Sequence, residues 1–389
     1  MTSPRIAIIG AGIAGLTLAR ALQTCGFAPR VYEQATVLGE VGAGLTITPN
    51  ASHVLHAIGL EPVLDNLGMR PDRGGVKDWR SGELLVEISR GNEMLLKYGA
   101  PYYQIHRADL HAALVKAVRD HDPAAIELGC EFRALHDVAG RVAVEFADGR
   151  HLEADVLVGA DGIRSKVRSQ LFGDGQARFT GYVAFRGLVE HESLPSGIID
   201  PTSCISTGPG RSFTRYLLRG GRLVNYVALT ERADWQEEGW SIRASVGELL
   251  QEFAGWYDDI HTIIRATPET RLFKWALFDR EPLPTWTQGH ATLLGDAAHP
   301  MLPFLGQGAA MGIEDALVFA RAFSAAGSIA EGLRRYEEAR LERANWVMLE
   351  SRKTAQNYHS GRRENFVSGK HVSAESLGLM AYNPAAVAV

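Results

Sequence analysis

The sequence contains a glycine-rich turn of the kind that binds the phosphates of a dinucleotide. Residues 10–15 read Gly-Ala-Gly-Ile-Ala-Gly and fit the pattern GxGxxG. In this pattern Gly10 permits a tight turn, Gly12 lets a pyrophosphate approach the backbone, and Gly15 lets the following helix pack on the preceding strand. The free N–H groups and the positive dipole end of that helix would face the phosphates. A structural turn without a ligand is the alternative, because the pattern alone is weak.

A carboxylate and two further turns are placed where the same ligand would pass. Glu33 closes a second strand-like run, where it can accept hydrogen bonds from an adenosine ribose. Downstream, Asp161-Gly162 and Gly295-Asp296 each follow a strand-like run and precede a helix. Asp296 can accept a hydrogen bond from a ribityl or ribose hydroxyl, although a structural Asx turn is the alternative for both motifs. Together these residues predict an ADP-containing cofactor, without choosing between NAD and FAD.

The segment 303–310, Pro-Phe-Leu-Gly-Gln-Gly-Ala-Ala, opens another expected helix. Its amides would form an electropositive helix start. If the cofactor is FAD, this helix start can stabilise the negative charge of the reduced flavin at its N1–C2=O end. Gly306 and Gly308 would allow a flat isoalloxazine ring to lie against the backbone. Small residues selected for helix packing are the alternative.

The elements that must position these turns follow from the apolar periodicity. Short β-branched runs predict buried strands over 5–9, 30–33, 155–159 and 291–294. Helical spacing predicts helices over 13–25, 107–120, 164–171 and 308–324. Asn50 is expected to cap a further helix. Strand signals separated by Gly and Pro dominate residues 178–229 and predict an antiparallel sheet inserted into an α/β framework.

The expected fold is therefore α/β, with a Rossmann-like nucleotide-binding domain, an inserted β-rich domain and a C-terminal helix. We assign residues 1–72, 101–176 and 281–328 to the nucleotide-binding domain, and residues 73–100 and 177–280 to the β-rich domain. Residues 329–360 carry many charges and are most simply a solvated outer helix. Beyond residue 360 the pattern fades, and we expect 361–389 to form a loosely ordered tail.

Composition narrows the class of protein. The 389 residues are 46% hydrophobic and 22% charged, which excludes disordered and collagenous classes. A net charge of −5 gives no footprint for nucleic acid, and three dispersed cysteines predict neither a disulfide framework nor a metal site. We expect no transmembrane helix and no signal peptide, and hence a cytoplasmic location. The 41 glycines exceed the roughly 27 of a typical chain, and the excess gathers at the motifs above.

The GxGxxG, Asp161-Gly162 and Gly295-Asp296 motifs, in this order, resemble those of the single-component flavin aromatic hydroxylases, the group A FAD monooxygenases. The resemblance covers about residues 5–345. It is closest to the branch that contains salicylate hydroxylases, hydroxybenzoate hydroxylases and 6-hydroxynicotinate monooxygenases. The sequences Val-Gly-Ala-Gly-Leu at 41–45 and His-Arg-Ala-Asp-Leu at 106–110 are similar to further motifs of that branch.

The resemblance implies a p-hydroxybenzoate hydroxylase-like fold, with FAD in the nucleotide-binding domain and a small aromatic substrate in the β-rich domain. It implies that NADH or NADPH reduces the FAD, which reacts with O2 to a C4a-hydroperoxide and hydroxylates a phenolic, hydroxybenzoate-like or hydroxypyridine-like ring. With one GxGxxG, NAD(P)H would approach from the surface. The family also implies aromatic catabolism and a possible homodimer. An FAD oxidase or reductase without oxygen insertion, and a silent flavin-binding protein, are the alternatives.

The resemblance assigns cofactor contacts residue by residue. Arg107 would contact the FAD pyrophosphate or the nearby ribose, with a surface arginine at a helix start as the alternative. The complete set of expected cofactor-binding residues is Gly10, Gly12, Ala14, Gly15, Glu33, Gln34, Gly44, Arg107, Asp161, Asp296, Gly306, Gly308 and Ala309.

The expected catalytic residues are Tyr216, Pro303 and His299. The family places Pro303 beside the substrate ring and a tyrosine such as Tyr216 within hydrogen-bond reach of the substrate. His299 is a candidate base, although a loop-stabilising role is favoured. Some hydroxypyridine-acting members carry a histidine base at the position of Thr46, so threonine here weakens a hydroxynicotinate assignment.

The substrate's remaining contacts are open at this point. Arg186, Arg215 and Tyr182 share the expected β-rich sheet, and an arginine there could bind a substrate carboxylate in a bidentate manner. A surface role is the alternative for each arginine, and no complete acid–base pair is evident.

Overall fold

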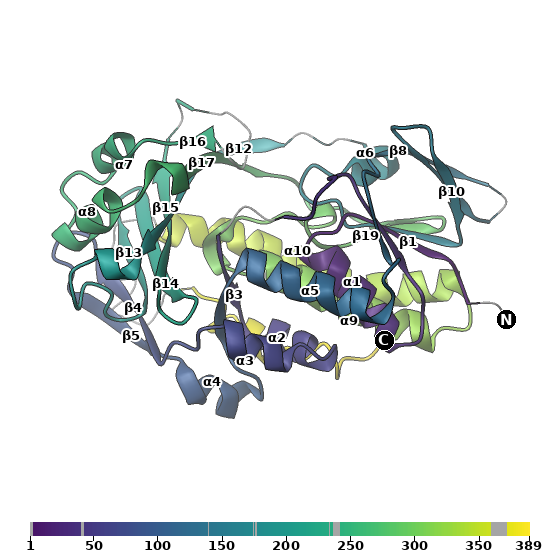
Figure 1. Ribbon diagram of the computed structural model, residues 1–389, viewed down its shortest axis with the longest axis horizontal. Coiled ribbons are helices and arrows are strands. Elements are labelled where there is room, and N and C mark those ends of the chain that lie inside the picture. The colour runs from purple at the N-terminus through teal and green to yellow at the C-terminus, as the bar shows by residue number, and fades with distance from the viewer. Residues whose placement is uncertain are drawn as a thin grey trace.

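The protein is described by a computed structural model. It covers residues 3–39, 43–138, 140–173, 175, 177–232, 234–235, 242–358 and 372–389. One sheet lies at each end of the molecule, with long helices between them (Figure 1). Within the described residues, no helix is both long and apolar enough to cross a membrane.

The first sheet holds the nucleotide-binding motifs. Its order is β18-β19-β11-β1-β2-β7, parallel except for the β18–β19 pair. Every residue of β1 and β11 is buried, as expected for central parallel strands. The strands are β1 (Ile6–Ile9), β2 (Arg30–Glu33), β7 (Ile126–Leu128), β11 (Val156–Gly159), β18 (Thr287–Gln288) and β19 (Ala291–Leu293).

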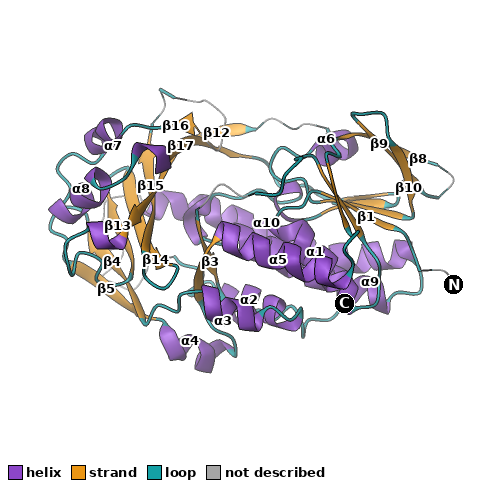
Figure 2. Ribbon diagram, in the orientation of Figure 1, coloured by secondary structure: helices purple, strands orange, loops and turns teal. Residues whose placement is uncertain are grey.

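The second sheet has eight strands in the order β16-β17-β12-β15-β14-β13-β4-β5. All pairs are antiparallel except β13–β4. Its strands are β4 (Arg73–Asp78), β5 (Leu84–Ser89), β12 (Arg178–Glu190), β13 (Ser203–Gly208), β14 (Arg211–Leu218), β15 (Leu223–Glu231), β16 (Ile242–Arg243) and β17 (Leu272–Asp279). Helices α7 (Val246–Glu252) and α8 (Asp258–Arg265) pack on one face through apolar residues (Figure 2). Two segments distant in sequence therefore build one sheet.

Helices connect and cover these sheets. Helix α1 packs against α5 and α9, and α9 packs against α10. The remaining helices are α1 (Ile13–Thr24), α2 (Pro49–Ala57), α3 (Glu61–Leu67), α4 (Gly91–Tyr98), α5 (Arg107–His121), α6 (Lys166–Phe172), α9 (Gly308–Ala325) and α10 (Ile329–Tyr358). A two-stranded ribbon pairs β3 (Gly44–Ile47) with β6 (Tyr103–His106), and β8 (Phe132–Asp137), β9 (Val142–Phe146) and β10 (His151–Ala154) form a small antiparallel sheet.

Three sequence expectations need correction. Asn50 is not the cap of α2, because Thr48 takes that place and Asn50 is buried inside the first turn. Helix α10 is not simply a solvated helix, since Tyr336 and Arg340 on it are completely buried. Residues 372–389 are not a loose tail, because apolar residues such as Leu379 pack into the main core. Residues 361–371 lie outside the described residues.

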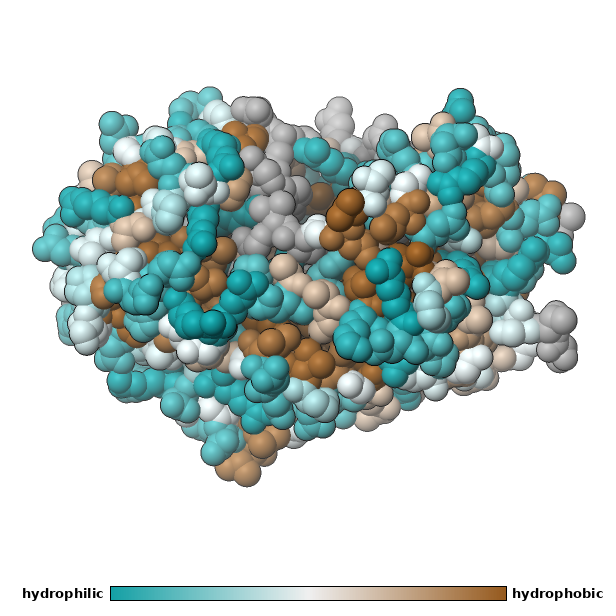
Figure 3. All heavy atoms as spheres, in the orientation of Figure 1, coloured by the Kyte–Doolittle hydropathy of each residue, from teal (hydrophilic) through white to brown (hydrophobic). Residues whose placement is uncertain are grey.

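The surface mixes polar and apolar residues (Figure 3). Six large apolar side chains among the described residues are exposed, and two of these are consecutive on α4. They are Val37, Leu84, Leu95, Leu96, Val138 and Trp346.

Candidate functional site

The glycine-rich turn between β1 and α1 has the geometry that its sequence predicts. Gly10 has a φ of 107°, and a Cβ there would lie 2.5 Å from the carbonyl oxygen of Ala160. A Cβ at Gly15 would overlap the carbonyl oxygen of Gly10. Gly12 precedes α1 and faces open space. Gly10 and Gly15 thus serve packing, whereas Gly12 leaves room for a ligand at the helix N-terminus.

Glu33 and His111 hold this turn from either side. Glu33 accepts hydrogen bonds from the backbone N–H groups of Ala11, at 2.8 Å, and Ala35, at 2.9 Å. The Nε2 atom of His111 lies 2.7 Å from the carbonyl oxygen of Ala11. Carboxylate oxygens have further acceptor capacity, so Glu33 can still receive a ribose hydroxyl. Gln34 beside it is exposed. The role of His111 could not be predicted from the sequence, because its partner Ala11 lies 100 residues away and no motif links the two.

The Asp161 side chain caps a helix. It accepts hydrogen bonds from the Ser165 hydroxyl at 2.5 Å and from the N–H groups of Lys166 at 2.8 Å and Val167 at 3.2 Å. Burial raises the pKa of Asp161, although these hydrogen bonds oppose the shift. These contacts give Asp161 a capping role at the start of α6, and its expected contact with the cofactor stays a prediction.

Asp296 lies beside the start of α9 and within the electrostatic influence of Arg107. Asp296 is accessible to solvent, but the protein atoms around its carboxylate displace part of its hydration and so raise its pKa. The charges of His299 and then Arg107 oppose this shift. Gly308 is close by, since a Cβ there would lie 4.0 Å from Asp296 Oδ1. Gly306 has a φ of 63° and faces open space. A carboxylate, the charge of Arg107 and the bare backbone of Gly308 are therefore close together at the start of α9.

The helices that carry these residues are in close contact. A Cβ at Gly295 or at Gly312 would lie 3.0 Å from the Cβ of Ala14. The Gly295-Asp296 turn and α9 thus pack directly on α1. Ala309 is half-buried in the first turn of α9. This packing joins the phosphate-binding helix to the segment that would hold the flavin ring, as a single FAD molecule requires.

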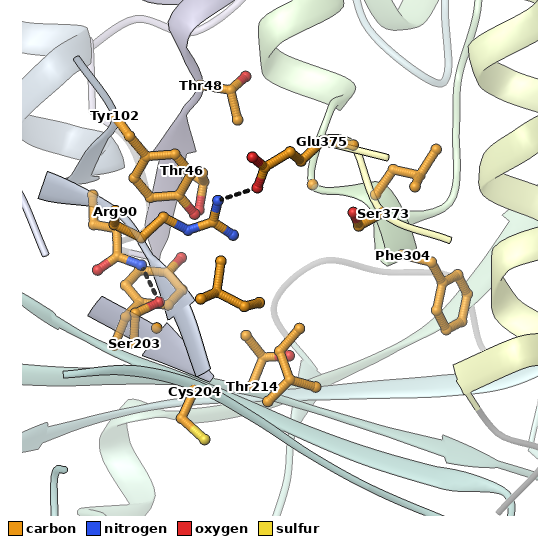
Figure 4. A pocket seen from close by; sticks show the side chains of 18 of the residues that line it. Thr46, Thr48, Arg90, Tyr102, Ser203, Cys204, Thr214, Phe304, Ser373 and Glu375 are labelled. Carbon is orange, nitrogen blue, oxygen red and sulfur yellow. Dashed lines mark hydrogen bonds and ion pairs between the residues drawn. The ribbon is translucent and has the colours of Figure 1, made fainter. Parts of the chain in front are cut away.

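A cavity of about 170 Å³ lies between the start of α9, the ribbon β3–β6 and the eight-stranded sheet. Figure 4 shows side chains from these elements around it. Its lining comprises Thr46, Thr48, Gly74, Gly75, Ile88, Arg90, Tyr102, Gln104, Ser203, Cys204, Ile205, Ser212, Thr214, Tyr216, Leu229, Pro303, Phe304, Leu305, Gly306, Ser373, Ala374, Glu375 and Met380. Tyr216 and Pro303, expected to be catalytic, therefore face the same cavity.

Tyr216 is held against the β3 strand. A Cβ at Gly44 would lie 2.5 Å from the Tyr216 hydroxyl oxygen, so glycine is required for the two to approach. The Gly44 N–H donates to Asn225 Oδ1 at 2.8 Å, and Asn225 is paired with Tyr216 across β14 and β15. Burial raises the pKa of Tyr216, followed by a smaller effect of Tyr102. The phenol therefore stays protonated and can donate a hydrogen bond. Val41 and Gly42 of the same motif lie outside the described residues.

The arginines expected near the substrate lie elsewhere. Arg215 is completely buried and donates to the backbone carbonyls of Pro201 and Asp200, at 2.8 and 3.2 Å. Arg186 stacks over Phe273 and Trp275. Neither lines the cavity, nor does Tyr182, which packs on Phe304. The cavity is instead lined by Arg90 and Glu375, and neither residue belongs to a motif that would mark it in the sequence.

His299 does not reach the cavity. Its ring is completely buried, and its Nε2 lies 2.5 Å from Asp315 Oδ2. Asp315 also accepts the Gly295 N–H at 3.0 Å and is paired with Arg340 at 2.7 Å. Burial raises the pKa of Asp315, but His299 and Arg340 outweigh it and lower the pKa to about 2. In this structure His299 stabilises the Gly295-Asp296 loop, which is the alternative that the sequence favoured, and it is not among the described residues that line the cavity.

A second part of this buried network holds the segment before α9. Asn50 donates to Gln307 Oε1 at 3.1 Å and to Glu314 Oε1 at 2.6 Å. Gln307 donates to Thr48 Oγ1 at 3.2 Å, and Arg340 is paired with Glu314 at 2.6 Å. Gln307 lies between Gly306 and Gly308 in sequence, so the network fixes the backbone that would face a flavin.

Comparison with known proteins agrees with this geometry. The family described as "FAD binding domain" matches residues 4–351. The chain is 41% identical over 357 residues to 3-amino-4-hydroxybenzoate 2-monooxygenase PtmB3 of Streptomyces platensis, covering 92% of this chain and 89% of that protein. It is 36% identical to 6-hydroxynicotinate 3-monooxygenase of Pseudomonas fluorescens, covering 89% of each.

Solved structures show the same fold. HpxO of Klebsiella pneumoniae, in complex with FAD and uric acid, superposes with a TM-score of 0.85 at 27% identity, covering 97% of this chain and 96% of HpxO. A salicylate hydroxylase substrate complex superposes with a TM-score of 0.83 at 26% identity, and the match covers 99% of this chain and 97% of that chain. The α/β fold and the resemblance to this group are thereby confirmed. The chain belongs to the FAD-binding domain family, and its cofactor is FAD.

Proposed function

We propose that the protein is an FAD-dependent monooxygenase that uses NADH or NADPH and O2 to hydroxylate a small, electron-rich aromatic ring. The observation that carries this proposal is the single cavity in which Tyr216 of one sheet faces Pro303 and Gly306 at the start of α9. The relatives named above act on hydroxylated benzoates and pyridines, which supports a phenolic or hydroxypyridine-like substrate. Bound FAD supplies hydride acceptance and oxygen activation.

The residues of the chain would bind the cofactor and orient the substrate. The α1 N-terminus and Gly12 would receive the pyrophosphate, and Asp296 and Arg107 would hold the adjoining hydroxyls and phosphates. Gly306, Gly308 and the first amides of α9 would face the flavin ring. These assignments agree with the open space at Gly12 and Gly306.

Around the substrate, Tyr216 would donate a hydrogen bond to the ring hydroxyl and so stabilise charge that develops on its oxygen. Pro303 and Leu305 would cover the ring and exclude water. Thr46 lines the cavity where some relatives carry histidine, and no histidine is among the described lining residues. We therefore infer no side-chain base of that type.

The test uses the purified yellow holoenzyme. NADH and NADPH oxidation is followed with a panel of phenolic and hydroxypyridine acids, while H2O2 and product mass are measured. A product heavier by one oxygen atom supports the proposal. Aromatic-independent turnover with stoichiometric H2O2 supports the oxidase or reductase alternative. A protein without bound flavin would contradict both. A cytoplasmic location and a homodimer remain predictions.

Replacing Tyr216 with phenylalanine is expected to lower kcat for hydroxylation about 100-fold, because the buried hydroxyl is lost as a hydrogen-bond donor. FAD content and the rate of flavin reduction should stay near those of the parent. Stopped-flow reduction and product yield measure the two effects separately. Tyr182→Phe is the matched control, since Tyr182 lies on the same sheet as Tyr216 but does not line the cavity. An unchanged product yield in Tyr216→Phe would remove Tyr216 from the site.

A further inference from the structure

The charges around the cavity are few. Among the described residues that line it, Arg90 is the only lysine or arginine and Glu375 is the only acid. The other side chains carry hydroxyl, amide, thiol, thioether, aromatic or aliphatic groups. A guanidinium in such a wall is suited to a carboxylate, with which it can form paired, charge-assisted hydrogen bonds.

The Arg90 side chain is fixed before any ligand arrives. Arg90 follows β5 and directly precedes α4, and its N–H donates to the carbonyl oxygen of Asp72 at 3.0 Å. Its guanidinium stacks over the Tyr102 ring at 4.8 Å, and the side chain is 14% exposed. Stacking uses the face of the guanidinium and leaves its N–H edge available. Figure 4 shows this side chain extending into the cavity toward Glu375.

Glu375 is held mainly by groups outside the cavity lining. Its carboxylate lies 2.8 Å from Lys97 Nζ and accepts from the Tyr98 hydroxyl at 3.2 Å. The Arg90 contact is the longest of the three, at 3.4 Å. Burial raises the pKa of Glu375, but Lys97 and Arg90 outweigh it, so the group is ionised. If the contact with Arg90 breaks, the Glu375 carboxylate therefore still has Lys97 and Tyr98 as partners.

The three ion-paired groups Arg90, Lys97 and Glu375 can together accept one additional anion. Arg90 and Lys97 carry two positive charges, and Glu375 carries one negative charge. A ligand with a single carboxylate would neutralise the cluster. The partial burial of Arg90 strengthens that attraction relative to a fully exposed pair.

We propose that Arg90 binds the carboxylate of an aromatic acid substrate. In the free enzyme the Glu375 carboxylate pairs with the Arg90 guanidinium, and the substrate carboxylate displaces it. The carboxylate would lie at Arg90, with the ring directed toward Tyr216 and Pro303. Glu375 stays on Lys97 and Tyr98 during the exchange, so the C-terminal segment keeps the cavity covered. This substrate class rests on the proposed aromatic hydroxylation.

The experiment measures binding apart from turnover. The holoenzyme is titrated with 3-hydroxybenzoate, 6-hydroxynicotinate and 3-amino-4-hydroxybenzoate, and with the carboxamide of each, using the change in flavin absorbance. The parent is expected to bind at least one acid more tightly than its amide. Arg90→Met should raise the Kd of that acid about 30-fold and change the Kd of its amide less than about threefold. Glu375→Gln should tighten acid binding about threefold, because a competing charge is removed.

Arg73→Met is the matched control, since Arg73 makes surface pairs with Glu87 and Asp200 and does not line the cavity. It should leave every Kd unchanged. The proposal is overturned if no acid binds more tightly than its amide, or if Arg90→Met weakens both equally. Weaker acid binding in Glu375→Gln would contradict the exchange. Failure of the proposed function is distinguishable, because it would show as acid-selective binding without hydroxylated product.

Discussion

Replacing Arg340 with methionine is expected to lower the free energy of unfolding by about 3–5 kcal/mol, because it leaves two buried carboxylates without their shared cation. Arg340 is completely buried between Asp315 and Glu314. Asp315 retains the Gly295 N–H and His299, and Glu314 retains Asn50 and Arg343. Glu314 thus keeps one guanidinium, that of Arg343, whereas Asp315 keeps none among its described contacts.

The same change should weaken FAD binding, since Asp315 fixes the Gly295-Asp296 turn. Denaturant unfolding and flavin-release titrations measure the two effects. Arg334→Met is the matched control on the same helix, because Arg334 is exposed and pairs only with Glu338 among the contacts described. It should change stability by no more than about 0.5 kcal/mol. Equal stability of the two variants would show that the buried network is not required.

Gly12→Val is expected to weaken FAD binding by about 100-fold or more without unfolding the protein. The position faces open space and has an ordinary φ of −74°, so the apoprotein accommodates a side chain. The same side chain would occupy the space that the pyrophosphate needs at the α1 N-terminus. Flavin content after purification and a Kd from fluorescence quenching measure the loss.

Gly39→Val is the matched control for this change. Among the described residues, Gly39 also has no neighbour within 4 Å of a Cβ. It has no positive φ, is exposed and lies outside the turn. Its FAD content should equal that of the parent. Full FAD retention in Gly12→Val, with normal circular dichroism, would contradict the assignment of the phosphate site.

The sequence predicts those parts of the site whose positions depend on residues close together in the chain. Gly10 and Gly15 could be placed because a strand–turn–helix unit is built from adjacent residues, and β2 ends at Glu33 as expected. Strand periodicity also placed Tyr216 on the sheet that faces the cavity. In each case the determining contacts lie within a few residues or along one strand.

The missed residues depend on contacts between distant segments. Arg90 and Glu375 are separated by 285 residues, and neither belongs to a motif. The many charges of α10 predicted a solvated helix, because charged side chains are seldom buried. Arg340 is nevertheless buried, and its charge is compensated by Glu314 on α9. Asp161 fits the family motif, but its hydrogen bonds to α6 appear only once the turn is folded.

Turnover in 18O2 tests the central claim most directly. The holoenzyme, NADH or NADPH and the aromatic acid that most stimulates nucleotide oxidation are incubated under labelled oxygen, and the product is analysed by mass spectrometry. The account predicts one 18O atom in each hydroxylated product molecule and one nucleotide consumed for each coupled turnover. Nucleotide consumption that yields only labelled H2O2, with the aromatic unchanged for every member of the panel, would contradict it.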